Sequence, residues 1–248
     1  MRSKIFLNDK PTDKWNEFLY ANHNIVSDIK DAQYVYTQLS PVVTYLPVFC
    51  PCTDVSHVYA DDVTFLDQDF KDGVGRRVTS TAEHALLLML LAARVHQIQL
   101  SGKLLGVIGR GRLGRHMVDY GHALGMSIIT NDIGDDNLNY LLAKSDVISL
   151  HIPLEGNENF LSYKELNLIK PNTILVNTSR PDVVNRRALA VNTEILYVDD
   201  FLNERPLYEP RYFQTPHLGG KTKEARELTD EYIINKLLER ISDDNGKV

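Results

Sequence analysis

Short apolar runs alternate with amphipathic stretches from residue 103 to about residue 200 of this chain. The runs are LLGVI, MSIIT, DVISLHI, NTILVN and EILYV, and each has the length and composition of a strand that is buried on both faces. Between two of them, SYKELNLI opens with Ser162 and Glu165 at the spacing of a helix capping box. Strands that alternate with helices predict a doubly wound α/β fold with a parallel sheet.

The first eighty residues are less periodic. SKIFLND, AQYVYTQL and YLPVFC are typical of strands and TDKWNEFLYA of a helix, which predicts a smaller α/β unit. Between the two regions, STAEHALLLMLLAARV begins with a second capping box, Ser80 and Glu83, and is apolar almost all round. Such a helix must be covered on more than one side, either by the core alone or by the core and a partner subunit.

A glycine-rich turn lies between a predicted strand and a predicted helix, in GVIGRGRLGRHM. Gly109, Gly111 and Gly114 have the spacing G-x-G-x-x-G, and Gly125 is placed to end the helix. The next strand ends at Asp132, which is 132 − 109 = 23 positions after the first glycine. This is close to the separation at which a carboxylate binds the ribose hydroxyls of a dinucleotide. The alternative is a packing turn that binds no ligand.

Each glycine has a physical task if a dinucleotide is bound. Gly109 permits the tight turn, Gly111 lets the backbone approach a pyrophosphate, and Gly114 lets the helix pack on the strand. The N–H groups at the start of the helix would face the anion. We expect NAD to be preferred to its 2′-phosphorylated form, because Asp132 repels a phosphate and is followed by Asp135 and Asp136 in place of an arginine.

Composition and charge narrow the function classes. The chain has 248 residues, of which 43% are hydrophobic and 24% charged, as in ordinary globular proteins. A net charge of −6 gives no electrostatic reason to expect nucleic acid or an anionic membrane surface as a partner. The longest apolar run, residues 85–93, is too short to span a bilayer and the N-terminus lacks an apolar signal segment, so we expect a cytoplasmic protein.

The only cysteines are Cys50 and Cys52, in FCPCTD. A C-x-C pair with His57 nearby leaves a tetrahedral metal site incomplete, so free thiols and no metal are expected.

Seven segments occur in the order found in the D-isomer-specific 2-hydroxyacid dehydrogenases: STAEHALLLMLLAAR, LSGKLLGVIGRGRLGR, LGMSIITND, SDVISLHIPL, KPNTILVNTSR, VDDFLNE and TPHLGG. The chain resembles this family over residues 80–220, and CTDVSHV is similar, more weakly, to the substrate loop of the family. The resemblance implies a Rossmann NAD-binding domain at residues 79–221. It also implies a smaller, flavodoxin-like substrate domain made of residues 1–78 and 222–248, to which the final helix returns. The whole is similar to a shortened family member without a regulatory domain, and we expect a homodimer.

The resemblance also implies a catalytic set. Arg180 matches the arginine that holds the substrate carboxylate and polarises the carbonyl, His217 the proton donor and acceptor, and Glu204 the carboxylate that pairs with that histidine. Asp199 matches the residue that recognises the nicotinamide carboxamide, and His151 is expected to border the cofactor cleft without transferring a proton. The implied cofactor-binding residues are Gly109, Gly111, Arg112, Leu113, Gly114, Asp132, His151, Pro153, Thr178 and Asp199, and the implied substrate-binding residues are Cys52, Thr53, Asp54 and Arg180.

Some positions depart from the family. Pro181 stands where glycine usually follows the arginine, and it fixes φ and removes an N–H. Asp54 places a negative charge in the loop whose N–H groups should receive the substrate carboxylate, and Glu155 replaces a small polar residue.

Three functions are compatible with these residues. The first is an NAD-dependent oxidoreductase that interconverts a 2-keto acid and a D-2-hydroxy acid. The second is a non-catalytic NAD-binding regulator on the same fold, and the third is a Rossmann enzyme with unrelated chemistry. Formate oxidation is disfavoured, because that branch of the family has no glutamate at the position of Glu204.

Overall fold

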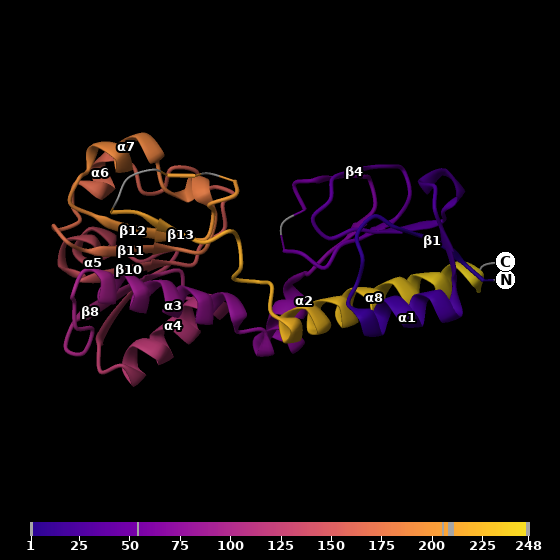
Figure 1. Ribbon diagram of the computed structural model, residues 1–248, viewed down its shortest axis with the longest axis horizontal. Helices are drawn as coiled ribbons and strands as arrows, with labels where there is room; N and C mark the ends of the chain where they lie inside the picture. The colour runs from indigo at the N-terminus through magenta and orange to yellow at the C-terminus, as the bar shows by residue number, and fades with distance from the viewer. Residues whose placement is uncertain (1, 54, 205, 208–210, 247–248) are drawn as a thin grey trace. The chain divides into compact units, whose positions relative to one another are not determined.

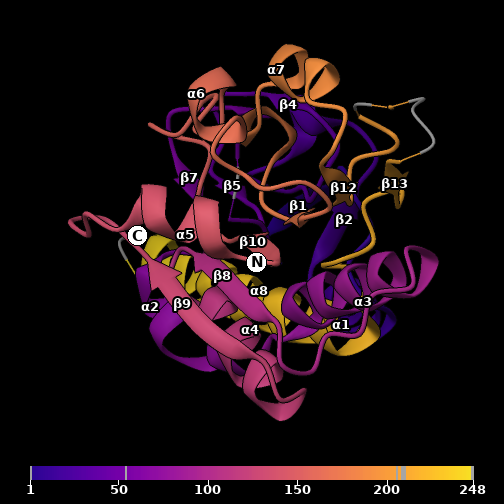
Figure 2. The same cartoon turned by 90° about the vertical axis from the view of Figure 1, so that its left-hand side faces the viewer.

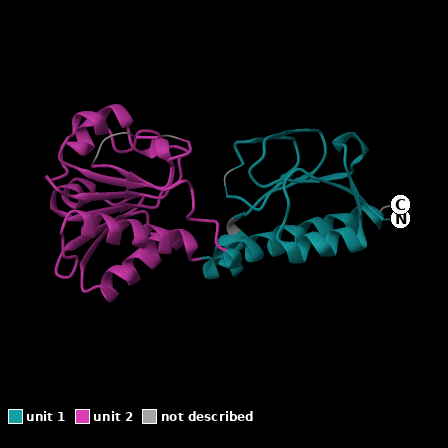
Figure 3. Ribbon diagram, viewed as in Figure 1, with its two compact units in different colours: residues 1–78, 223–248 teal, residues 79–222 magenta. Residues whose placement is uncertain are grey.

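The protein is described here by a computed structural model, which covers residues 2–53, 55–204, 206–207 and 211–246. The chain divides into two compact units (Figures 1 and 3). Unit 1 contains Met1–Val78 and Lys223–Val248, and unit 2 contains Thr79–Thr222. The division expected from the sequence differs from this one only at residue 222.

Unit 2 is built on a parallel sheet with helices on both faces (Figures 1 and 2). Its strand order is β13-β12-β11-β10-β8-β9. The strands are β8 (Leu104–Ile108), β9 (Ser127–Asn131), β10 (Val147–Leu150), β11 (Ile174–Asn177), β12 (Leu196–Asp199) and β13 (Phe213–Gln214). The predicted doubly wound fold is confirmed, and its five predicted strands are present. Strand β13 was not predicted.

The helices of unit 2 form two layers. Those on one face are α3 (Ser80–Val95) and α4 (Arg112–Ala123), and those on the other are α5 (Leu138–Lys144), α6 (Tyr163–Leu166) and α7 (Arg186–Val191). Successive strand residues point to opposite faces of the sheet. Val107 packs against the layer of α3 and α4, and its neighbour Ile108 packs against the layer of α5, α6 and α7. Both sheet faces are therefore buried, which explains the continuous apolar runs.

The predicted capping boxes have different outcomes. The box of Ser162 and Glu165 at α6 is present, although α6 ends earlier than expected. The box at α3 is wrong, because Thr79 and not Ser80 is the N-cap residue. The Thr79 hydroxyl donates to Glu83 Oε1 at 2.5 Å, and the Ser80 hydroxyl is buried with no hydrogen-bond partner among the described residues.

Helix α3 is only partly covered within unit 2. Ala85, Leu88 and Met89 are fully buried, whereas Leu87 and Leu90 are 53% and 41% exposed. By length and composition, Val74–Val95 is the one described stretch that could cross a membrane. Half of its most apolar 18-residue segment is buried, as in the core helix of a globular domain.

Unit 1 has a parallel sheet of order β2-β1-β3-β5-β7. Its strands are β1 (Lys4–Leu7), β2 (Asn24–Val26), β3 (Tyr34–Tyr36), β5 (Val48–Phe49) and β7 (Val63–Thr64). Numbered along the sheet, this is the 2-1-3-4-5 order of flavodoxin-like folds, so the predicted fold of the smaller unit is confirmed. One face packs on α1 (Asp13–Asn22), α2 (Gln68–Asp72) and α8 (Lys223–Asn245). The Tyr36 hydroxyl donates to Asp230 Oδ1 at 2.6 Å and so ties β3 to α8.

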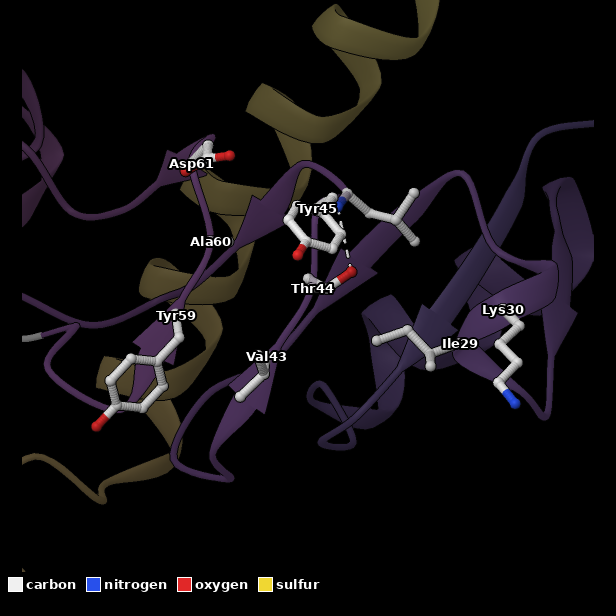
Figure 4. Close-up of a pocket in the computed structure, with 9 residues that line it drawn as sticks. Ile29, Lys30, Val43, Thr44, Tyr45, Tyr59, Ala60 and Asp61 are labelled. Carbon is white, nitrogen blue, oxygen red and sulfur yellow. Dashed lines mark hydrogen bonds between the residues drawn. The ribbon is translucent and has the colours of Figure 1, made fainter.

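The other face of this sheet carries a 3-10 turn, Ile29–Asp31, and a small sheet of β4 (Val42–Val43) and β6 (Val58–Tyr59). A pocket of about 450 Å³ lies there, with Tyr45 and Tyr59 beside it (Figure 4). Among the described residues, none that the sequence predicts for a site lines this pocket.

Candidate cofactor and catalytic site

The predicted site residues of unit 2 follow the carboxyl ends of its parallel strands. The glycine-rich turn follows β8, and His151 follows β10. These two strands are neighbours, but the connection through α4 leads away from β10 to β9 on the other side. This point, where the strand order reverses, is where open α/β sheets bind their ligands.

Two of the three glycines are required by the packing of the chain itself. Gly109 has φ +94°, and a Cβ atom there would lie 2.5 Å from the carbonyl oxygen of His151. A Cβ at Gly114 would overlap the carbonyl oxygen of Gly109. Gly111, which caps α4, is different, because a Cβ there would meet no atom within 4 Å. The open space in front of the helix N-terminus fits a pyrophosphate and argues against a turn made only for packing.

Asp132 follows β9 directly and is held by the backbone. Its Oδ2 accepts from the N–H of Arg110 at 2.6 Å, and its Oδ1 accepts from the N–H of Ile133 at 2.8 Å. Burial acts to raise the pKa of Asp132, but these hydrogen bonds outweigh it and hold the pKa below its ordinary value. The carboxylate is ionised and 32% exposed, so it can accept from ribose hydroxyls.

An arginine does stand beside Asp132, contrary to the expectation from the sequence. Arg110, from the glycine-rich turn, places its Nη2 2.9 Å from Asp135 Oδ2 and its Nε 4.0 Å from Asp132 Oδ2. This side chain comes from the turn after β8, so the residues that follow β9 in the sequence do not reveal it. Asp135 already pairs with this guanidinium.

Two buried polar atoms near the strand ends have no hydrogen-bond partner among the described residues: His151 Nδ1 and Thr178 Oγ1. The other nitrogen of His151 lies 2.8 Å from Ser149 Oγ, and burial lowers the pKa of His151 to about 4. The imidazole is therefore neutral at pH 7, in accord with a residue that borders the cofactor and transfers no proton. Unpaired buried polar atoms of this kind fit a site that is completed by a ligand.

Asp199, the last residue of β12, is 2% exposed. Its Oδ1 accepts from the N–H of Phe201 at 3.0 Å and from Gln214 Nε2 at 2.8 Å. Burial raises the pKa of Asp199 to about 6, and the hydrogen bonds only partly offset that rise. Both donors are groups of the chain itself. The predicted contact between Asp199 and the nicotinamide carboxamide therefore stays a prediction.

Arg180 lies in a tightly tied loop after β11. The side chain of Asn177 accepts from the N–H of Ser179 at 3.0 Å and donates to the carbonyl of Arg180 at 2.9 Å. Pro181 is accommodated here, because it is the first residue of the 3-10 turn Pro181–Val183, where no N–H is needed. The unusual proline does not disturb the backbone that carries Arg180.

His217 and Glu204 form a close pair. His217 Nδ1 lies 2.6 Å from Glu204 Oε1, and the two side chains are 40% and 42% exposed. His217 has φ +58°, and its ring stands edge-on to Phe201 with the centroids 6.0 Å apart. With Nδ1 engaged by the carboxylate, Nε2 is the nitrogen that can exchange a proton with a ligand.

Strand register brings level the three strand ends that precede the predicted catalytic residues. Asn177 pairs with Asp199, and Asp199 pairs with Gln214, so β11, β12 and β13 end level with one another. Arg180, Glu204 and His217 follow these ends within a few residues. The same register continues through β10 to β8 and the glycine-rich turn.

The predicted substrate loop belongs to unit 1. Cys52 Sγ donates to the carbonyl of Gln38 at 3.1 Å, Thr53 is exposed, and Asp54 lies outside the described residues. Both cysteines are free thiols. Within the described ranges, no group of three or more His, Cys, Asp or Glu side chains could hold a metal ion.

Comparison with known proteins decides the family. The sequence profile for the NAD binding domain of D-isomer specific 2-hydroxyacid dehydrogenases matches residues 91–219, which is more than half of the chain. The chain belongs to this family. The resemblance inferred from the motifs is thereby confirmed, and the cofactor of the matched domain is NAD.

The relatives differ in substrate. A glyoxylate reductase of Thermococcus litoralis is 35% identical over 162 residues, which are 56% of this chain and 49% of the relative. An erythronate-4-phosphate dehydrogenase of a Shewanella species is 28% identical over 196 residues, 70% of this chain and 52% of the relative. The chain thus spans about half the length of the curated relatives it matches.

Solved structures agree on the fold. The NAD+-bound 3-phosphoglycerate dehydrogenase of Entamoeba histolytica has a TM-score of 0.78 at 17% identity, with 98% of this chain and 97% of that chain covered. At this identity the similarity shows the fold alone, and it extends over both units.

Proposed function

We propose that this chain transfers a hydride between NAD(H) and a small 2-keto acid or D-2-hydroxy acid. The observation that carries the proposal is the 2.6 Å contact between His217 Nδ1 and Glu204 Oε1. These residues follow the same edge of the sheet as the loop of Arg180 and the glycine-rich turn. A reduction of this kind requires a histidine oriented by a carboxylate for proton transfer and an arginine for the substrate carboxylate.

The cofactor, when bound, supplies the hydride. Gly111 and the N-terminus of α4 would hold its pyrophosphate and Asp132 its adenosine ribose, since one site is open and the other offers an ionised carboxylate. The hydroxyl of Thr178 is a further buried group without a partner in the described chain.

The chain's own residues do the remaining work. Arg180 binds the substrate carboxylate through two parallel N–H donors and fixes the direction of the neighbouring carbonyl. His217 gives a proton from Nε2 to the carbonyl oxygen in reduction and takes it back in oxidation. Glu204 holds the proton on Nδ1, which orients the ring. The keto acid thus gains one hydride and one proton, and the hydroxy acid loses both in the reverse direction.

We also propose that the protein acts as a homodimer with α3 in or beside the interface. Leu87, Leu90 and Val95 leave an apolar strip of α3 uncovered in unit 2, and two-fold dimers are the commonest soluble assembly.

A screen of small 2-keto acids with reduced NAD, followed by nicotinamide absorbance, tests the activity. We expect at least one acid to be reduced, and we expect His217→Ala to lower its turnover by roughly a hundredfold or more while NAD binding, measured by calorimetry, is kept. Near-normal turnover by the variant would contradict the role of His217. NAD binding with no turnover of any acid would favour the non-catalytic regulator instead.

A further inference from the structure

Asp200 is a buried carboxylate that the proposed chemistry does not use. It follows β12 directly, and its side chain is 4% exposed. Its Oδ1 accepts from the N–H of Leu218 at 2.8 Å and from the hydroxyl of Thr215 at 2.5 Å. Its Oδ2 accepts from the N–H of Gly219 at 2.7 Å. Three groups of one short segment, residues 215–219, therefore converge on a single side chain.

These contacts lie on both sides of His217. Thr215 precedes it by two residues, Leu218 follows it at once, and Gly219 comes next. His217 itself has φ +58°, in the left-handed region that residues other than glycine seldom adopt. A conformation of this kind persists only where the surrounding contacts determine it. Asp200 makes three of these contacts, and Asn203 Nδ2 makes another by donating to the carbonyl of Pro216 at 3.3 Å.

A second element anchors Asp200 from the opposite direction. His84, a buried residue of α3, places Nε2 3.2 Å from Asp200 Oδ1 and 2.8 Å from the Thr215 hydroxyl oxygen. The segment also approaches closely, since a Cβ at Gly219 would lie 3.1 Å from Asp200 Oδ2. Asp200 thus links a core helix to the segment that carries His217.

We propose that Asp200 is a positioning residue, which holds residues 215–219 so that His217 Nδ1 stays on Glu204 and Nε2 faces the reacting oxygen. The catalytic use of His217 rests on the proposed function, but the position of its side chain can be measured without substrate.

The chemistry of the partners calls for a carboxylate at this position. Both backbone groups can only donate, and the Thr215 hydroxyl donates as well, so the side chain must accept through both oxygens. Burial acts to raise the pKa of Asp200, but the bonds from His84, Thr215 and the two N–H groups hold it at about 2, so the acceptor is permanently charged at working pH. An amide at this position would turn an NH2 group toward one of the donors.

Asp200→Asn is the test, because it keeps the shape and removes one acceptor. In protein labelled with 13C at histidine Cε1, the His217 signal is assigned from its loss in His217→Asn. We expect the Cε1 chemical shift of His217 in Asp200→Asn to move toward its value in Glu204→Gln. We also expect amide exchange at Leu218 and Gly219 to accelerate by roughly tenfold or more. Where a keto acid is turned over, we expect kcat to fall roughly 10- to 100-fold with KM little changed.

The control is Asp146→Asn. Asp146 is also an acid of unit 2 that accepts a backbone N–H, from Leu104 at 2.8 Å, but it lies at the amino edge of the sheet with Lys170. We expect this variant to leave the His217 signal and the exchange at Leu218 and Gly219 unchanged.

A second variant covers the case in which Asp200→Asn does not fold. His84→Phe keeps the ring, removes the Nε2 hydrogen bond from α3 and leaves Asp200 in place, and we expect a smaller change of the same kind. A folded Asp200→Asn whose His217 chemical shift and amide exchange equal those of the starting protein overturns the positioning role. Where Asp200→Asn does not fold, the same result in a folded His84→Phe overturns it. If no keto acid is reduced, the proposed function fails, but the two substrate-free measurements still decide this inference.

Discussion

His217 Nδ1 and Glu204 Oε1 are 2.6 Å apart although they follow different strands, β13 and β12. The pair is formed by the two segments that leave neighbouring strand ends, and it is open to solvent on one side, with both side chains about two-fifths exposed. An imidazole held in this way has one nitrogen fixed and the other free, which is the arrangement of an oriented acid or base.

Glu204→Gln should therefore lower keto-acid reduction without affecting the cofactor. The amide keeps the size of the side chain but removes the carboxylate that orients the ring, so we expect kcat to fall roughly 10- to 100-fold. The NAD dissociation constant, measured by calorimetry, serves as the control and should stay within about twofold. A kcat equal to that of the unaltered protein would show that the contact has no part in proton transfer.

Arg180→Lys should mainly weaken substrate binding. An ammonium group cannot make the two parallel hydrogen bonds of a guanidinium, so we expect KM for the keto acid to rise by roughly tenfold or more. The matched control is Arg187→Lys, since Arg187 is exposed on α7 and has no predicted role. Equal KM values for the two variants would remove Arg180 from the substrate site.

We expect the choice between NAD and its 2′-phosphorylated form to depend on the pair formed by Arg110 and Asp135. We expect NAD to bind more tightly than its 2′-phosphorylated form, because Asp132 repels the phosphate and Asp135 neutralises the only guanidinium seen close to it among the described residues. Asp135→Asn should free Arg110 to bind the phosphate. We expect the ratio of the two dissociation constants, measured by calorimetric titration of each cofactor, to shrink by roughly tenfold.

The control for this prediction is Asp136→Asn, which removes the same charge from the exposed neighbouring residue. A similar gain in affinity for the phosphorylated cofactor in Asp136→Asn would indicate an effect of overall charge and not of Arg110. Tighter binding of the phosphorylated cofactor by the unaltered protein would refute the prediction altogether.

The buried carboxyl of Asp199 should make stability depend on pH. Its pKa is raised by burial to about 6 in the folded state, against 3.8 for the ordinary group. A raised pKa means that the stabilising contribution is complete below about pH 4 and is lost as pH rises through 6. The free energy of unfolding should fall by up to about 3 kcal/mol over that range from this group.

Asp199→Asn should abolish this component. The measurement is urea unfolding at pH 4 and pH 7.5. The change in the free energy of unfolding between these pH values is compared between the two proteins, so that other titrations cancel. His151, for example, acts in the opposite sense, because its lowered pKa removes stability as pH falls from 6.5 toward 4. The control is Asp119→Asn, since Asp119 is exposed on α4. If the free energy of unfolding changed equally with pH in all three proteins, burial of Asp199 would not be the cause of the pH dependence.

Much of unit 2 could be predicted from the sequence because its strands are buried on both faces and therefore stand out as apolar runs. Strand β13 could not, since it has two residues and Phe213 is 42% exposed. The cap of α3 was misplaced by one residue because Thr79 and Ser80 are both good caps, and only the backbone distinguishes them.

The polar contacts of the site were harder to predict than its motifs. Glu204 and His217 were identified by resemblance, but Asp200 was overlooked because its partners come from α3 and from the segment after β13. Arg110 was overlooked because its long side chain reaches from one strand end to another. Sequence spacing reveals which residues share a turn, whereas such contacts depend on which strands become neighbours.

The exposed strip of α3 leads to a prediction about assembly. Leu87 and Leu90 are 53% and 41% exposed, and they lie on a helix whose other side is fully buried in the core. We expect a dimer by light scattering at micromolar concentration, and we expect Leu87→Glu to shift it to a monomer, because a buried unpaired carboxylate disfavours the interface strongly. Leu39→Glu is the matched control, since Leu39 is 55% exposed and belongs to unit 1. It should leave the dimer intact. Loss of the dimer in both variants would indicate a general effect of charge, and a monomeric mass for the unaltered protein would refute the assembly.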